Sequence, residues 1–301
     1  MKIVILNFIF ILLFSFSVMA NNNDKLKDKF IVVLDAGHGG HDSGNRGNGY
    51  LEKEIALTIT LEIGKLLSKN KDIEVIYTRK DDRYVDLFKR AQIANNANAD
   101  LFISIHCDAF TSPKAYGAGT FVLGLHANER NFEVAKKENS VIFLEDDYEK
   151  NYDGFDPNNP ESIISLLLMQ EEYLEQSIIA ATSIQKSFVS VLGRKDRTVK
   201  QAGFIVLKYT YMPSVLVETG FLTNKKEGAY LNSKEGKNSM AKTISKAIID
   251  YKNQLNTFVS AEKFNPSITG SISKDKVELT KSLSYKVQIS ASKNKIETKS
   301  Y

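Results

Sequence analysis

Short apolar runs rich in β-branched residues alternate along the chain with longer segments of helical periodicity. The runs that predict strands are Phe30 to Leu34, Ile73 to Thr78, Leu101 to Ile105, Thr120 to Leu123 and Ser214 to Val217. The helical patterns cover about Glu52 to Ser68, Val85 to Asn98 and Ser239 to Tyr251. This alternation predicts an α/β fold, in which a twisted, mostly parallel sheet carries helices on both faces.

The stretch from Gly124 to Gln201 interrupts the alternation. It contains a polar helical segment at about Asn128 to Asn139, an acidic loop from Glu145 to Pro160 and a long helical pattern at about Ile163 to Val191. Long inserted segments are often functional. We interpret 124–201 as a helical insertion near the active site that acts as a lid or regulatory element, with a merely tolerated loop as the alternative.

The first twenty residues have the pattern of a secretory signal peptide. Lys2 precedes an almost entirely apolar stretch, and small residues lead to Ala20 before a polar run begins. We expect cleavage after Ala20, which predicts export to the periplasm and no stable membrane insertion afterwards. An uncleaved anchor is the alternative, although the apolar stretch is shorter than the roughly 20 residues that span a bilayer.

The end of the chain differs in composition from the body. We expect a catalytic domain over 21–253, a linker over 254–283 and, over 284–301, the start of a further module. Residues 253–301 carry eight lysines against four acids. A basic tail on a nearly neutral body argues against nucleic-acid binding and is compatible with weak attraction to an anionic envelope polymer.

Two histidines and two glutamates are the candidate functional residues. His38 lies in a glycine-rich turn after the first predicted strand, and His106 follows the third. Sites in such sheets collect at the carboxyl ends of strands, so His38, His106 and a carboxylate such as Glu52 can supply three ligands to Zn²⁺ and leave its fourth position for water. Glu218 follows an apolar run and would be costly to bury without a partner. The pattern indicates a hydrolytic metal site.

Other assignments of these residue types stay open at this point. Glu52 fits equally a first-turn acid that interacts with the helix dipole, and Glu54 competes with it as a ligand. His41 and His126 match no ligand spacing, and we interpret them as surface or loop residues. The single cysteine, Cys107, excludes an internal disulfide.

Four separated motifs in a fixed order extend these observations: Asp35 to Gly40, Glu52-Lys53, Ser104 to His106 and Pro213 to Asn224. With them, the chain resembles the zinc-dependent N-acetylmuramoyl-L-alanine amidases of the amidase_3 family, which separate daughter cells. The resemblance covers about residues 29 to 253.

The resemblance implies a function and a role for each candidate residue. His38, Glu52 and His106 match the family's zinc ligands, and Glu218 matches its catalytic carboxylate; the Glu-Lys pair favours Glu52 over Glu54. The implied reaction hydrolyses the amide between N-acetylmuramic acid and L-alanine in peptidoglycan, for septal wall splitting and cell separation.

The resemblance also implies regulation. Some members carry a helix that blocks the cleft, sometimes with a glutamate on the zinc, until an activator protein displaces it. Ile163 to Ser177, with Glu171 and Glu172, is the matching segment, and our hypothesis places Glu172 at the fourth zinc position in the resting enzyme. An ordinary amphipathic helix is the alternative. Residues 284–301 resemble the first strand of a SPOR-like peptidoglycan-binding module, either truncated or vestigial.

Three rival functions remain at this stage. The chain could be a zinc peptidase that cuts within the stem peptide, although the usual His-Glu-x-x-His pattern is absent. It could instead be a non-catalytic peptidoglycan-binding or activator protein, for which a lost ligand would be the sign. A structural envelope protein held by the basic tail is the third rival.

Overall fold

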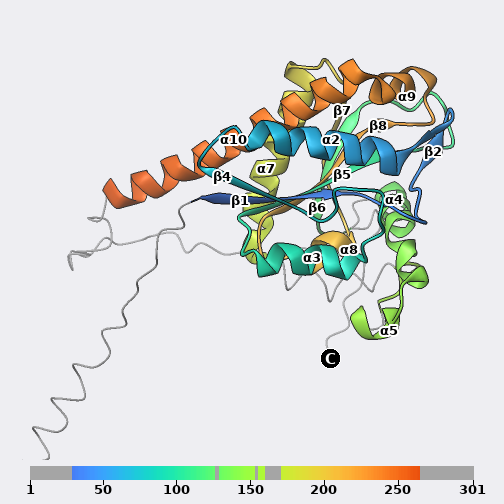
Figure 1. Ribbon diagram of the computed structural model, residues 1–301, viewed down its shortest axis with the longest axis horizontal. Helices are drawn as coiled ribbons and strands as arrows, with labels where there is room; N and C mark the ends of the chain where they lie inside the picture. Colours follow the sequence, from blue (N-terminus) through green and yellow to red (C-terminus); the bar gives the residue numbers. More distant parts are fainter. Residues whose placement is uncertain (1–28, 126–128, 153–154, 160–170, 265–301) are drawn as a thin grey trace, which may run out of the picture. The chain divides into compact units, whose positions relative to one another are not determined.

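The computed structural model describes residues 29–125, 129–152, 155–159 and 171–264. At its centre lies a six-stranded sheet with the order β4-β1-β5-β8-β6-β7 (Figure 1). The strands, in the order of the sheet, are β4 (Ile73–Tyr77), β1 (Phe30–Ala36), β5 (Leu101–Asp108), β8 (Ser214–Phe221), β6 (Ala118–Leu123) and β7 (Asp196–Ala202).

The sheet is mostly parallel, as the sequence predicts. The strands β4, β1, β5 and β8 run parallel to one another, whereas β6 is antiparallel to β8 and parallel to β7. The five predicted strands are all present. The sequence analysis missed β7, because Asp196–Ala202 is largely polar and forms an edge of the sheet, where no apolar run is needed.

Helices cover both faces of the sheet (Figure 1). Side chains alternate between the faces, so Val32 and Leu34 belong to one hydrophobic cluster and Val33 to another. The first cluster includes side chains of α2 (Glu52–Leu67), α7 (Glu171–Ser190) and α10 (Lys234–Phe264). The second includes side chains of α3 (Leu87–Asn96), α4 (Glu129–Asn139) and α8 (Ile205–Lys208). The predicted α/β class is confirmed.

Much of the segment 124–201 is integral to the fold. Ala181, Ile184 and Phe188 of α7 are fully or almost fully buried, and β7 pairs with β6. The rest of the described insertion, between β6 and α7, comprises α4, the 3-10 helix η1 (Ser140–Leu144) and α5 (Tyr148–Asn151). Among the described residues of the insertion, this part is the candidate for the lid-like element that the sequence suggested.

Short elements complete the description: the hairpin β2 (Arg46–Gly47) and β3 (Tyr50–Leu51), and α9 (Lys225–Asn232). The helix α10 extends to Phe264, so the first part of the expected linker is helical. One compact unit ends at Thr257, within this helix. The expected signal peptide and the expected module over 284–301 lie outside the described residues. Within the described ranges, no helix has both the length and the apolar character needed to cross a membrane.

Candidate metal centre

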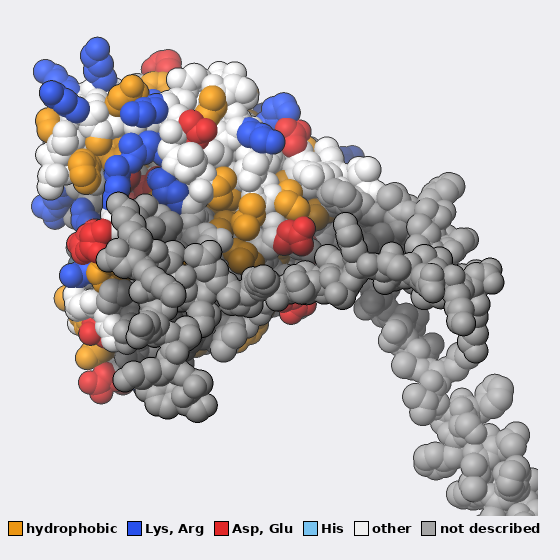
Figure 2. Space-filling model, turned by 180° about the vertical axis from the view of Figure 1, so that it is seen from behind, with side chains coloured by type: hydrophobic (Ala, Val, Ile, Leu, Met, Phe, Trp, Pro, Cys, Tyr) orange, Lys and Arg blue, Asp and Glu red, His pale blue; other side chains and the backbone are white. Residues whose placement is uncertain are grey.

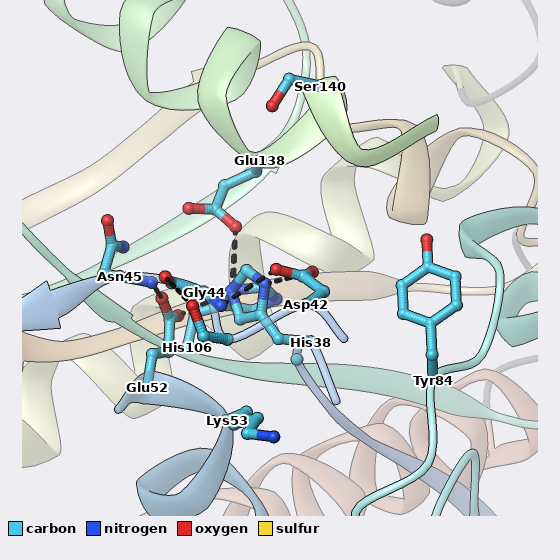
Figure 3. Close-up of polar contacts among 12 residues, drawn as sticks. His38, Asp42, Gly44, Asn45, Glu52, Lys53, Tyr84, His106, Glu138 and Ser140 are labelled. Carbon is cyan, nitrogen blue, oxygen red and sulfur yellow. Dashed lines mark hydrogen bonds and ion pairs between the residues drawn. The ribbon is translucent and has the colours of Figure 1, made fainter. Parts of the chain in front are cut away.

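Four side chains converge beside the carboxyl ends of β1 and β5 (Figure 3). They belong to His38, Glu52, His106 and Glu138, and one potential ligand atom from each lies within 4.8 Å of all the others. The sequence predicted the first three as ligands, and the structure brings them together. Glu138 is an addition that the sequence analysis did not anticipate.

The distances between these atoms fit a small cation. Glu52 Oε1 lies 3.1 Å from both His38 Nε2 and His106 Nδ1, and Glu138 Oε2 lies 3.2 and 3.3 Å from the same two nitrogens. A tetrahedron with bonds of about 2.0 Å has edges of about 3.3 Å. His38 Nε2 and Glu138 Oε2 are buried and have no hydrogen-bond partner among the described residues. The geometry and the ligand chemistry therefore suit a tetrahedral metal ion.

Glycines allow the two imidazoles to approach. A Cβ atom on Gly37 would lie 2.5 Å from His106 Cε1, and a Cβ atom on Gly44 would lie 2.5 Å from His38 Cδ2. Both contacts are too short for any other residue type. His38 itself has a positive φ of 60°, which directs its ring from the end of β1 back over the site.

A second set of polar groups orients the imidazoles. His38 Nδ1 lies 2.8 Å from Asp42 Oδ2, which leaves Nε2 for the metal. His106 Nε2 lies 3.0 Å from Ser104 Oγ, and that hydroxyl donates to Asp35 Oδ2 at 2.6 Å. Each ring therefore has one nitrogen held by protein and the other facing the cluster.

Asp35 is the buried anchor of this arrangement. Its other oxygen accepts hydrogen bonds from Thr78 Oγ1 at 2.6 Å and Arg90 Nη1 at 2.8 Å, and Arg90 also donates to the backbone oxygen of His38. Burial alone would raise the pKa of Asp35, but the charge of Arg90 and hydrogen bonds from Ser104 and Thr78 lower it overall. Asp35 thus stays ionised and holds the His38 loop and the ring of His106 in place.

Glu52 occupies the first position of α2 and is fully buried. Its two carboxylate oxygens accept backbone N–H groups of Asn45 and Cys107, each at 2.7 Å. Burial raises the pKa of Glu52, but the charge of His38 and hydrogen bonds from both histidines outweigh it and lower the pKa. Glu54, the competing candidate, is exposed. The structure therefore presents Glu52 to the cluster as a preformed carboxylate.

Glu218 lies on β8, where it is the register partner of His106 on β5. Its side chain is only 3% exposed, and neither of its carboxylate oxygens has a hydrogen-bond partner among the described residues. Burial, followed by the negative charges of Asp108 and Glu52, raises the pKa of Glu218 well above its usual range. A buried carboxylate without partners is costly to the fold and is typical of a functional group.

Glu172 does not lie in the cluster. It is exposed near the start of α7, because that helix packs its apolar side against the sheet. Most of the segment Ile163 to Ser177, and the side chain of Glu171, lie outside the described residues. Among the described residues, the fourth side chain of the cluster is Glu138 and not Glu172.

Comparisons with known proteins agree with this geometry. Residues 32–250 match the Amidase_3 family, described as N-acetylmuramoyl-L-alanine amidase. The chain belongs to this amidase family. Because its members are amidohydrolases, the family assignment establishes a hydrolase and the predicted class of enzyme is confirmed.

Individual relatives cover most of the amidase domain. The N-acetylmuramoyl-L-alanine amidase AmiA of Escherichia coli K12 is 34% identical over 226 residues, which is 74% of this chain and 76% of AmiA. A probable amidase AmiB of Haemophilus influenzae is 32% identical over 267 residues, 83% of this chain and 57% of that protein. A solved amidase from Clostridium difficile 630 superposes with a TM-score of 0.58 at 26% identity, over 75% of this chain and 98% of that one.

In this amidase, α4 carries Glu138 into the site from above (Figure 3). The side chain of the next residue, Asn139, donates to the backbone oxygen of Gly203 at 2.7 Å and accepts from the backbone N–H of Ile205 at 2.9 Å. Lys137 donates to the side chain of Asn45. Burial raises the pKa of Glu138, but the charge of His38 and hydrogen bonds from His106 and His38 together outweigh it, and the pKa falls to about 2.

The sequence analysis missed Glu138 for a physical reason. It is one of many acids in the inserted segment, and no fixed spacing relates it to His38 or His106. The one available signal was the helical pattern at Asn128 to Asn139, which carries this acid at its end. Its position over the site depends on contacts between α4 and residues far away in the sequence.

Proposed function

We propose that this chain is exported and hydrolyses the amide between the lactyl group of N-acetylmuramic acid and L-alanine in peptidoglycan, using Zn²⁺ held by His38, Glu52 and His106. One observation carries the proposal: three potential ligands meet on one face of the sheet, and the buried, unpartnered carboxylate of Glu218 lies on the neighbouring strand. The family assignment supports the substrate.

The metal, when bound, supplies Lewis-acid chemistry that polarises a carbonyl and makes water more acidic. Glu218 accepts a proton from the attacking water and delivers it to the nitrogen of L-alanine as the amide bond breaks. A muramyl carboxylic acid and a free stem peptide are released.

The networks behind the ligands keep them ready for this reaction. Asp42 holds the ring of His38, and Ser104 with Asp35 holds that of His106. Such outer contacts fix the orientation and basicity of metal ligands. The protein therefore presents a pre-organised site, and substrate binding requires no rearrangement of these three ligands.

Among the described residues, Glu138 is the best candidate for a group that keeps the enzyme inactive at rest. Its carboxylate lies 3.2 and 3.3 Å from His38 Nε2 and His106 Nδ1, where it would compete with substrate and water for a metal held by these residues. We therefore propose that the structure corresponds to a resting enzyme and that α4 withdraws before turnover. Displacement by an activator protein at the division site would have to exchange the polar contacts of Asn139 and the packing of Ala135 against the second hydrophobic cluster.

The proposed function is tested with purified peptidoglycan. The mature protein and its Glu138→Gln variant, in which the resting contact is weakened, are incubated with the substrate and Zn²⁺, and the products of both are identified by mass spectrometry beside Glu218→Gln and chelated controls. Intact stem peptides with a free L-alanine amine are expected, and both controls should lack them. Cleavage within the stem peptide would instead establish a peptidase, and wall binding without products would establish a non-catalytic protein.

A further inference from the structure

Three cationic side chains line a cavity at β7, the edge strand of the sheet. Arg130 of α4 and Arg197 and Lys200 of β7 contribute to the walls of a cavity of about 630 Å³. Figure 2 shows that Lys and Arg side chains gather toward one end of the face it displays, with hydrophobic side chains between them. The proposed reaction has so far given these three residues no role.

A larger cleft connects this cavity with the metal centre, because it shares one lining residue with each of them. Arg130 also lines the larger cleft of about 990 Å³, whose other lining residues include Asp108 and Glu138. Glu138 is one of the four converging side chains of the metal centre. A substrate that enters this cleft can therefore reach both the metal centre and the cationic cavity.

Strand register places Lys200 on the same face as Glu218. Gly119 is the antiparallel register partner of Glu218, so a Cβ atom on Gly119 would project to the face that carries the Glu218 side chain. Such an atom would lie 3.2 Å from Lys200 Nζ. The ammonium group of Lys200 thus lies over β6, one strand beyond the proposed proton-transfer group.

The positive charges of the cavity are not neutralised by ion pairs. None of the three cations forms a salt bridge with a carboxylate of the described residues. Each instead lies over an aromatic ring: Lys200 Nζ is 4.6 Å from the Phe121 centroid, and the Arg197 and Arg130 guanidinium carbons are 5.2 and 5.8 Å from that of Phe221. Burial and the charge of Arg197 lower the pKa of Lys200 to about 8.

The direction of the reaction indicates which part of the substrate meets these charges. Across the sheet the order is β5 with His106, β8 with Glu218, β6, and β7 with Lys200. In the proposed reaction His38, Glu52 and His106 would hold the metal that polarises the carbonyl, and Glu218 delivers the proton to the leaving amine. The peptide that continues from this amine therefore extends toward β6 and β7.

We propose that the cavity formed by Arg197 and Lys200 binds a carboxylate of the stem peptide beyond L-alanine and so makes the amidase selective for acidic stem peptides. This inference rests on the proposed function. A carboxylate would satisfy the two cations by charge-assisted hydrogen bonds. Both residues belong to the sheet, so they stay in place when α4, with Arg130, withdraws.

The test compares two soluble muramyl peptides that differ only in whether the first carboxyl group after L-alanine is free or amidated. Initial rates give kcat/KM for the full-length mature protein and for Lys200→Gln, Arg197→Gln and Lys195→Gln; Lys195 is an exposed neighbour and serves as the matched control. The wild-type protein is expected to prefer the free acid by about tenfold or more, the value of one charge-assisted hydrogen bond. Lys200→Gln and Arg197→Gln should each reduce this preference about tenfold, whereas Lys195→Gln and the conservative Lys200→Arg should keep it.

A binding measurement separates this inference from the proposed function. Calorimetry with the free stem peptide and its amide, without any turnover, should show the same preference and the same loss in Lys200→Gln. Equal cleavage of both substrates, or an unchanged preference in Lys200→Gln, would overturn the inference while leaving the amidase intact. Preferential binding of the free acid without cleavage of either substrate would support the cavity and refute the proposed reaction.

Discussion

Glu218 and His106 are register partners on the neighbouring parallel strands β8 and β5. Adjacent strands are about 4.8 Å apart, and their separation is fixed by backbone hydrogen bonds. The proposed proton-transfer group and a proposed metal ligand therefore keep a constant spacing that does not depend on loops. Both residues therefore lie in the middle of the sheet.

Because Glu218 is not one of the four converging side chains, its substitution should lower the rate of hydrolysis without changing metal binding. Glu218→Gln keeps the shape of the side chain but removes its ability to accept a proton, so kcat should fall about 10²- to 10⁴-fold. Zinc content, measured by mass spectrometry of the metal, should be unchanged. The exposed Glu74 gives the control substitution Glu74→Gln. A Glu218→Gln protein with wild-type turnover would remove Glu218 from the mechanism.

Loss of a proposed ligand should reduce the affinity of the protein for Zn²⁺. His38→Ala removes the Nε2 atom that faces Glu52 and Glu138, so the variant should bind little zinc. Added Zn²⁺ raises the melting temperature of a protein that binds it in the folded state, and this increase should be absent in the variant. His41→Ala, at an exposed histidine three residues away, should behave like the wild type. An equal zinc response in His38→Ala would exclude the proposed ligand.

Weakening the contact between Glu138 of α4 and the two histidines should raise the basal rate of peptidoglycan hydrolysis. Glu138→Gln removes the negative charge that the cluster attracts, so peptidoglycan hydrolysis in the absence of any partner should increase by about tenfold or more, the effect of one charge-assisted contact. Glu133→Gln changes an exposed acid of the same helix and is the control. Activity that falls in Glu138→Gln would show that Glu138 assists catalysis and does not inhibit it.

Arg90 should be a major source of stability. It is 1% exposed and paired with the fully buried Asp35 at 2.8 Å, so Arg90→Ala would leave an unpaired buried carboxylate. The free energy of unfolding should fall by about 3–5 kcal/mol, measured by urea denaturation. Lys89→Ala breaks the ion pair of an exposed lysine with Asp86 and should cost about 1 kcal/mol or less. Comparable losses in the two variants would contradict the role of the buried pair.

The lowered pKa of Lys200 predicts that the free energy of unfolding changes with pH in the alkaline range. Its pKa is about 8 in the folded protein and 10.5 as its usual value, because burial, first of all, and the charge of Arg197 disfavour the ammonium form. The unfolded chain therefore binds more protons between these two values, and stability attributable to Lys200 rises with pH across that interval.

Lys200→Met removes this titration. The variant should be more stable than the wild type at pH 7, by on the order of 2 kcal/mol, and this advantage should shrink as the pH rises from 8 to 10.5. Urea denaturation at several pH values measures the difference. Lys195→Met, at an exposed lysine, should show no such trend. A constant difference between Lys200→Met and the wild type would contradict the lowered pKa.

Local sequence patterns predicted most of the fold. The five apolar runs all became strands, because strands buried on both faces require continuous apolar residues. The missing strand, Asp196–Ala202, is held at the edge of the sheet by backbone pairing with β6, and backbone pairing leaves no mark on side-chain polarity. The long helix α10 overran its expected end at Tyr251 for a similar reason, since polar helical residues and linker residues have similar composition.

The sequence by itself pointed to three of the four converging side chains and to Glu218, because His38 and His106 follow apolar strand patterns and the family motifs single out Glu52 and Glu218. The tertiary structure alone decided the rest. Glu138 reaches the metal centre only because Asn139 is bound to the distant Gly203 and Ile205. Arg197 and Lys200 lie on the same face of the sheet as Glu218 only because an edge strand pairs in one register. Such contacts arise from packing between segments that are far apart in the chain, and no periodicity or spacing within one segment encodes them.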